Sequence, residues 1–131
     1  IDLIIRGISC LIPGVKGYTE NIRVISIVGR FLEHSRIYIF GAPDSEDCKV
    51  YIASADFMTR NTTKRVEVAA PILDADIKER IIGMFNLILR DNVKVRELKK
   101  DGNYFQSKSG DVKLNSQEYF YALAYQKGEE M

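Results

Sequence analysis

The chain has 131 residues, of which 46% are hydrophobic and 28% are charged. This size and balance are typical of one globular domain, so we expect residues 1–131 to form a single domain. The net charge of +1 argues against a strongly basic nucleic-acid-binding surface, and any anion site must therefore be built locally. No apolar stretch is long enough for a transmembrane helix, and no signal peptide is visible.

Short runs of β-branched and aromatic residues predict strands in the first half of the chain. We expect these strands over residues 3–5, 22–28, 36–41, 48–54 and 64–70, with a single helical turn over residues 29–33. Strands 36–41 and 48–54 form the clearest hairpin, because turn-forming residues separate them. If Gly41 faces Cys48 in this hairpin, Tyr38 pairs with Tyr51.

Helix and strand patterns alternate in the second half. Asp74 is a suitable N-cap for a helix whose apolar positions recur at helical spacing as far as Ile88. Residues 92–98 predict another strand, residues 99–114 a polar loop, and Ser116 the start of a last helix. This order predicts a mixed α/β (α+β) sandwich with helices packed on a central β-sheet.

The only histidine, His34, lies two residues before Arg36 at the start of a predicted strand. Imidazole can carry a proton near neutral pH or act as a nucleophile, and a guanidinium group suits phosphate oxygens. Because side chains alternate along a strand, His34, Arg36 and Tyr38 fall on one face. The pair is a candidate site for phosphoryl chemistry. A surface histidine beside an edge-strand salt bridge is the other interpretation.

Two further positions could bind an anion. The hairpin register brings residues 54–61 to His34, and their hydroxyl, amide and backbone N–H groups can form an oxyanion cradle. Ordinary turn chemistry explains the same residues equally simply. Arg6 follows the first strand, where a phosphate ligand and a structural salt bridge are both plausible. The sequence contains no P-loop or dinucleotide fingerprint, and no cluster of metal ligands.

The order of these motifs resembles the C-terminal catalytic domain of the family-1 polyphosphate kinases. Four segments carry the resemblance: DLIIRGI (2–8), ENIRVISIVGRFLEHSRIY (20–38), YIASADFMTRN (51–61) and RVEV (65–68). The resemblance covers most of the chain and is strongest before Pro71. It implies a domain similar to phospholipase D. In that superfamily a His-x-Lys motif and a later Ser/Asn turn form the site; here His34 and Arg36 correspond to the motif, with arginine in place of lysine, and Ser54 with Asn61 correspond to the turn.

The resemblance also implies an activity. Members of the family transfer the terminal phosphate of ATP reversibly to inorganic polyphosphate, with Mg²⁺ and a phosphohistidine. By this resemblance Arg6 and His34 contact the ATP phosphates, while Ser54 and Asn61 form a phosphate cradle. His34 is then a second histidine, an acid/base or phosphate stabiliser assisted by Arg36. The phosphorylated histidine and most Mg²⁺ contacts belong to an upstream domain that this chain lacks, so no metal ligand is assigned within it.

From the same resemblance we expect ATP or ADP, inorganic polyphosphate and the upstream domains as partners, and no nucleic acid. We expect the full-length protein to be a homo-oligomer in the bacterial cytoplasm, free or associated with the membrane, and the fragment alone to be inactive. Two alternatives remain open. One is a phospholipase D-type phosphodiesterase or nuclease half-site that pairs by dimerisation, and the other is a non-catalytic polyphosphate-binding module.

Overall fold

The computed structural model describes residues 1–43, 45–106, 110 and 112–129. The chain divides into two compact units, the first comprising Ile1–Glu33 with Ile88–Met131 and the second His34–Leu87. Each unit contains strands and helical residues, which confirms the predicted mixed α/β class. The strands form two sheets, one in each unit. That residues 1–131 act as a single domain stays a prediction.

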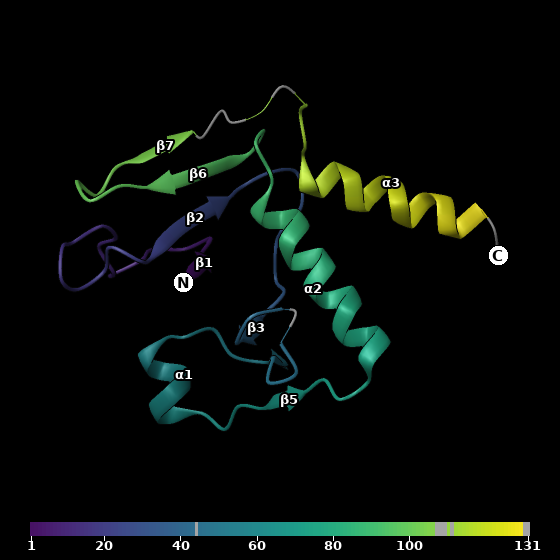
Figure 1. Cartoon of the computed structure of the whole chain (residues 1–131), viewed down its shortest axis with the longest axis horizontal. Helices are drawn as coiled ribbons and strands as arrows, with labels where there is room; N and C mark the ends of the chain where they lie inside the picture. The colour runs from purple at the N-terminus through teal and green to yellow at the C-terminus, as the bar shows by residue number, and fades with distance from the viewer. Residues whose placement is uncertain (44, 107–109, 111, 130–131) are drawn as a thin grey trace. The chain divides into compact units, whose positions relative to one another are not determined.

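The first unit is built on a four-stranded sheet in the order β1-β2-β6-β7 (Figure 1). Its strands are β1 (Asp2–Ile4), β2 (Arg23–Ile27), β6 (Val95–Leu98) and β7 (Tyr104–Gln106). β1 and β2 run parallel, and the other two pairs are antiparallel. The core of this unit is formed by Ile25, Ile27 and Val95, which are at most 3% exposed. Burial of these three side chains holds β2 and β6 together.

The first residue of helix α3 (Ser116–Glu129) is hydrogen-bonded to the buried carboxylate of Asp91. Asp91 Oδ2 accepts hydrogen bonds from both the backbone N and the Oγ of Ser116, at 2.7 and 2.8 Å. Its Oδ1 accepts from the backbone N of Val93, Lys94 and Val95. One side chain thus joins the start of α3 to the turn that enters β6.

The second unit holds the antiparallel sheet β3-β4-β5. Its elements are β3 (Ile37–Phe40), β4 (Lys49–Ala53), α1 (Thr59–Lys64), β5 (Ala69–Pro71) and most of α2 (Ala75–Leu89). Tyr38 pairs with Tyr51, which confirms the predicted hairpin register. Gly41 closes this hairpin with a φ of +90°, a conformation that other residues rarely adopt.

The predicted start of α2 is also confirmed. Asp74 Oδ1 accepts a hydrogen bond from the backbone N of Ile77 at 2.9 Å. This is the contact that an N-cap side chain makes with the third helical residue. The last two residues of α2, Ile88 and Leu89, pack against the core of the first unit, to which they belong.

Three local predictions were wrong. Residues 29–33 form no helical turn, because their backbone is bound by the Gln117 side chain instead. Residues 64–70 are not one strand: α1 ends at Lys64, and only Ala69–Pro71 pairs with β4. The predicted loop 99–114 contains β7. Among the described residues, no helix combines the length and the apolar character needed to cross a membrane.

Candidate phosphoryl-transfer site

The candidate site is built where the β3–β4 hairpin ends. The backbone O of Arg36 accepts a hydrogen bond from Ala53 N at 3.0 Å, so strand pairing extends one residue beyond β3. Asp56 lies three residues further along the chain. Arg36 Nε donates to Asp56 Oδ1 at 2.8 Å, and Arg36 Nη2 donates to Asp56 Oδ2 at 3.5 Å. One edge of the guanidinium group is therefore held by a carboxylate.

The same guanidinium group reaches His34. Arg36 Nη2 lies 3.0 Å from His34 Nε2, and the imidazole is exposed. The Arg36 side chain itself is only 18% exposed. Its hydrogen bond with Asp56 raises the pKa of Arg36 above the ordinary value, so the guanidinium group stays charged at working pH. The structure thus brings His34 and Arg36 together, as the sequence predicted.

Tyr38 supports the segment that carries Asp56. Its hydroxyl group donates to the backbone O of Ala55 at 3.1 Å, and its ring packs edge-on against Phe57 with centroids 5.5 Å apart. Burial raises the pKa of Tyr38, with a further increase from the Asp56 charge, so the phenol stays neutral and keeps its proton for this bond. Arg36 and Tyr38 both contact residues 55–57, which agrees with their predicted common face.

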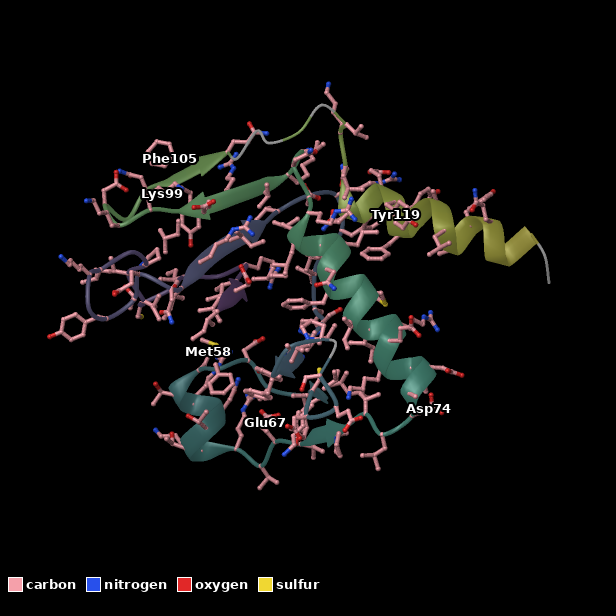
Figure 2. All side chains as sticks on the ribbon, viewed as in Figure 1. Met58, Glu67, Asp74, Lys99, Phe105 and Tyr119 are labelled. Atoms are coloured by element: carbon pink, nitrogen blue, oxygen red, sulfur yellow. The ribbon has the colours of Figure 1, made fainter. Side chains whose placement is uncertain are left out.

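Ser54 and Asn61 both make internal hydrogen bonds. Ser54 Oγ donates to Glu67 Oε2 at 2.6 Å and accepts from Val68 N at 3.0 Å. Figure 2 labels Glu67 on the segment that leads to β5 and Met58 next to α1. Asn61 is 6% exposed, and its Nδ2 donates to the backbone O of Asp56 at 3.0 Å. Its Oδ1 is buried and has no hydrogen-bond partner in the part of the chain that the structure describes.

These contacts give both residues a supporting role around residues 54–68. A direct contact of Ser54 or Asn61 with phosphate stays a prediction. Arg6 belongs to the first unit, where it lies in the bend after β1 with its side chain exposed. Its contact with ATP phosphate also stays a prediction.

Comparison with known proteins identifies the family to which the chain belongs. Residues 1–117 match the family described as "Polyphosphate kinase C-terminal domain 2". The chain belongs to the polyphosphate kinase family. It is 51% identical to a polyphosphate kinase of Bacillus cereus over 127 residues, which are 96% of this chain and 18% of that protein. It is 48% identical to a polyphosphate kinase of Staphylococcus epidermidis over 131 residues, again 18% of that protein.

A solved polyphosphate kinase has the same fold. The crystal structure of the polyphosphate kinase from Porphyromonas gingivalis aligns with a TM-score of 0.86 at 37% identity, over 99% of this chain and 20% of that one. The predicted family and its fold class are therefore confirmed. The chain spans about a fifth of the length of these polyphosphate kinases.

The described residues of this polyphosphate kinase segment contain no cluster of metal ligands. Among the described residues, no group of three or more His, Cys, Asp or Glu side chains is placed to hold a metal ion. The two carboxylates nearest the candidate site, Asp56 and Glu67, are each engaged, by Arg36 and by Ser54. We therefore derive no step of the reaction through Mg²⁺ held by this chain.

Sequence reasoning missed two carboxylates that contact the predicted site residues, Asp56 on Arg36 and Glu67 on Ser54. Asp56 was recognised only as part of the turn 54–61, although the predicted register already placed Ala53 opposite Arg36. A carboxylate three residues beyond that pair is within reach of a long cationic side chain. The signal was therefore present in the register. Glu67 could not be found in this way, because it lies in the segment that was wrongly predicted to be a strand.

Proposed function

We propose that this chain forms part of an ATP:polyphosphate phosphotransferase, which moves the γ-phosphate of ATP reversibly onto inorganic polyphosphate. The nucleophile would be a histidine of an upstream domain, which attacks the γ-phosphate, releases ADP and becomes the phosphohistidine from which polyphosphate takes the phosphoryl group. The observation that carries the proposal is the Arg36 guanidinium group, held between Asp56 and His34 in a member of the polyphosphate kinase family. Mg²⁺ would be bound mainly outside the chain.

Arg36 would bind a phosphate oxygen with the edge that Asp56 leaves open. Asp56 and His34 occupy Nε and Nη2, and no hydrogen bond from the described residues occupies Nη1. Two N–H donors on Nη1 suit a phosphate group. Because phosphoryl transfer depends mainly on positioning and electrostatics, a fixed guanidinium group is an effective contribution.

Asp56 also neutralises part of the Arg36 charge, so a second cation is needed near a triphosphate. Arg6 is the candidate in this chain, in agreement with the family resemblance. Ser54 and Asn61 would complete the cradle by fixing the turn that carries Asp56. His34 would act on the attacking or leaving oxygen as an acid/base group or as a hydrogen-bonding phosphate stabiliser.

The test is the substitution His34→Ala in the full-length kinase. We expect ATP-dependent polyphosphate synthesis to fall by on the order of a hundredfold or more, because acid/base groups typically contribute this much. Ser35→Ala is the matched control, since Ser35 is the exposed neighbour and makes no hydrogen bond among the described residues. Synthesis at a near-normal rate by the His34 variant would refute its role.

The same protein distinguishes the two alternatives. Hydrolysis of a chromogenic phosphodiester by a homodimer would favour the phosphodiesterase. Calorimetry with ATP and with polyphosphate addresses the binding module, which should bind polyphosphate in a salt-sensitive manner without binding nucleotide. A homo-oligomeric enzyme in the bacterial cytoplasm, free or membrane-associated, remains part of the proposal.

A further inference from the structure

We propose that Asp56 is a positioning residue that, through Arg36, holds His34 in the tautomer with its proton on Nδ1. The three side chains form a sequence of contacts from carboxylate to guanidinium to imidazole, with the distances of 2.8 Å and 3.0 Å given above. The geometric part of the inference stands on these contacts alone. Its catalytic meaning rests on the proposed phosphotransferase function.

The tautomer follows from the donors and acceptors of the two groups. A guanidinium group has five N–H donors and no acceptor, so the Nη2 atom must donate in its contact with His34 Nε2. Nε2 must then offer a lone pair. A neutral imidazole carries one proton, which is therefore on Nδ1. An imidazolium ion has donors on both nitrogens and cannot accept this bond.

Asp56 fixes the orientation of the Arg36 guanidinium group. An arginine side chain has many rotamers, and immobilising one requires a fixed partner. Asp56 binds Nε and Nη2 on one edge, which sets the direction in which the remaining Nη2 hydrogen points. The segment under Asp56 is itself fixed, because Asn61 Nδ2 binds the backbone O of Asp56 and the Tyr38 hydroxyl binds that of Ala55.

The nearby charges favour the same arrangement. Arg36 is influenced by the negative charges of both Asp56 and Glu67, and each raises its pKa. Glu67 is held in place by the Ser54 hydroxyl group. The cation therefore faces two carboxylates and one imidazole, and it stays protonated as a donor to His34.

The tautomer has a consequence for the role of His34. With Nε2 engaged by Arg36, the N–H that His34 can present to a phosphate oxygen is the one on Nδ1. No hydrogen bond from the described residues occupies this atom. In this arrangement His34 donates a hydrogen bond from Nδ1 and does not act as a nucleophile, so the attacking histidine must come from elsewhere.

The test is nuclear magnetic resonance on the 131-residue chain, in which His34 is the only histidine. Long-range ¹H–¹⁵N correlation distinguishes the protonated ring nitrogen from the unprotonated one. The spectrum is recorded near pH 8.5, above the ordinary imidazole pKa of about 6.5. We expect the proton on Nδ1 in the unmodified chain, and loss of this preference in Asp56→Ala. Asp47→Ala removes the same charge from an exposed turn of the same unit and should leave the tautomer unchanged.

A proton on Nε2 in the unmodified chain would overturn the inference, as would an Asp56→Ala spectrum identical to that of the unmodified chain. The Asn61 bond to the backbone O of residue 56 remains possible in the alanine variant, so the turn should persist. If that variant does not fold, Arg36→Met gives the same test, because methionine keeps a long side chain but has no N–H donor for His34 Nε2. We expect the Nδ1 preference to be lost there too, and its retention would overturn the inference.

Activity is read separately in the full-length kinase. We expect Asp56→Ala to lower kcat about tenfold with a smaller change in KM for ATP, and Asp56→Glu to recover part of the loss. A confirmed tautomer together with a full-length protein that makes no polyphosphate from ATP would refute the proposed function while leaving the positioning role of Asp56 intact. Normal synthesis by His34→Ala would refute only the catalytic role of His34. An unchanged tautomer in Asp56→Ala would refute the positioning role whatever the activity.

Discussion

Asp91 is a carboxylate that is only 3% exposed, yet it stabilises the first unit because five hydrogen bonds converge on it. Burial alone would raise the pKa of Asp91. The hydrogen bonds from Ser116, Lys94 and Val93 outweigh this effect, so its pKa lies below the ordinary value of 3.8. The ionised carboxylate is therefore the form that the folded chain requires.

We expect Asp91→Asn to lower the free energy of unfolding by about 3 kcal/mol at pH 7, since the amide places a donor against the two Ser116 donors. Chemical denaturation measures the change. Asp101→Asn is the matched control, because Asp101 also binds its neighbour Asn103 but is exposed. Asp101→Asn should lower the free energy of unfolding far less than Asp91→Asn does. Equal losses in the two variants would contradict the role given to Asp91.

The same carboxylate predicts a pH dependence. A depressed folded pKa contributes stability that is present above the unfolded value of about 3.9 and is lost as pH falls through the folded value. The stability difference between the unmodified chain and Asp91→Asn should therefore be constant from pH 7 to about pH 5 and shrink below about pH 4. A difference that stays constant down to pH 2 would show that folding does not lower the pKa of Asp91.

At the scale of single residues, the sequence allowed His34 and Arg36 to be identified as a pair because a single residue separates them, so they fall on one face of an extended segment. It did not reveal Asp91, since an aspartate between a helix and a strand resembles any other turn residue. Only the folded chain brings Ser116 to it, across 25 positions of sequence. Long-range polar contacts of this kind carry no local signal.

Among the elements, the segment 29–33 that leads to His34 depends on a side chain of α3. Gln117 Oε1 accepts from Phe31 N at 3.0 Å, and its Nε2 donates to Phe31 O and Glu33 Oε1. Gly29 makes room for this contact, since a Cβ there would lie 2.4 Å from Gln117 Oε1. The segment is therefore ordered by one amide group rather than by a helical turn.

A double-mutant cycle tests this arrangement. We expect Gly29→Ala and Gln117→Ala each to lower the free energy of unfolding by about 2 kcal/mol, by displacing or removing the amide. In the Gln117→Ala background, Gly29→Ala should have almost no effect, because the clash is gone. The coupling should therefore exceed about 1 kcal/mol, measured by denaturant titration of the four proteins. Additive losses would show that the two residues act independently.

Hydrophobic alternation predicted the elements whose side chains are buried and failed for those that are exposed. β2 and the β3–β4 hairpin carry buried or partly buried positions, and their predicted positions were confirmed. All three residues of β5 and of β7 are exposed, so neither strand shows a pattern of burial. Conversely, Val66 and Val68 alternate with charged residues but are 98% and 65% exposed. Alternation indicates a strand only when one face is covered.

For the molecule as a whole, the decisive fact is that the chain spans about a fifth of its polyphosphate kinase relatives and holds one histidine. A reversible transfer through a phosphohistidine needs a nucleophilic imidazole nitrogen with a free lone pair. The lone pair of His34 Nε2 accepts a hydrogen bond from Arg36. The 131-residue chain should therefore supply groups that bind phosphate and donate hydrogen bonds, without the attacking group.

We accordingly expect the isolated chain, incubated with γ-³²P-labelled ATP and polyphosphate, to give no labelled polyphosphate and no acid-labile label on the protein. The full-length kinase assayed in parallel should give both, since the label would reside on the upstream histidine. Full-length His34→Ala should keep the labelled protein intermediate more than it keeps polyphosphate synthesis, because that substitution leaves the nucleophile in place. Label on the isolated chain that disappears with His34→Ala would instead identify His34 as the nucleophile and contradict both its tautomer and its assigned role.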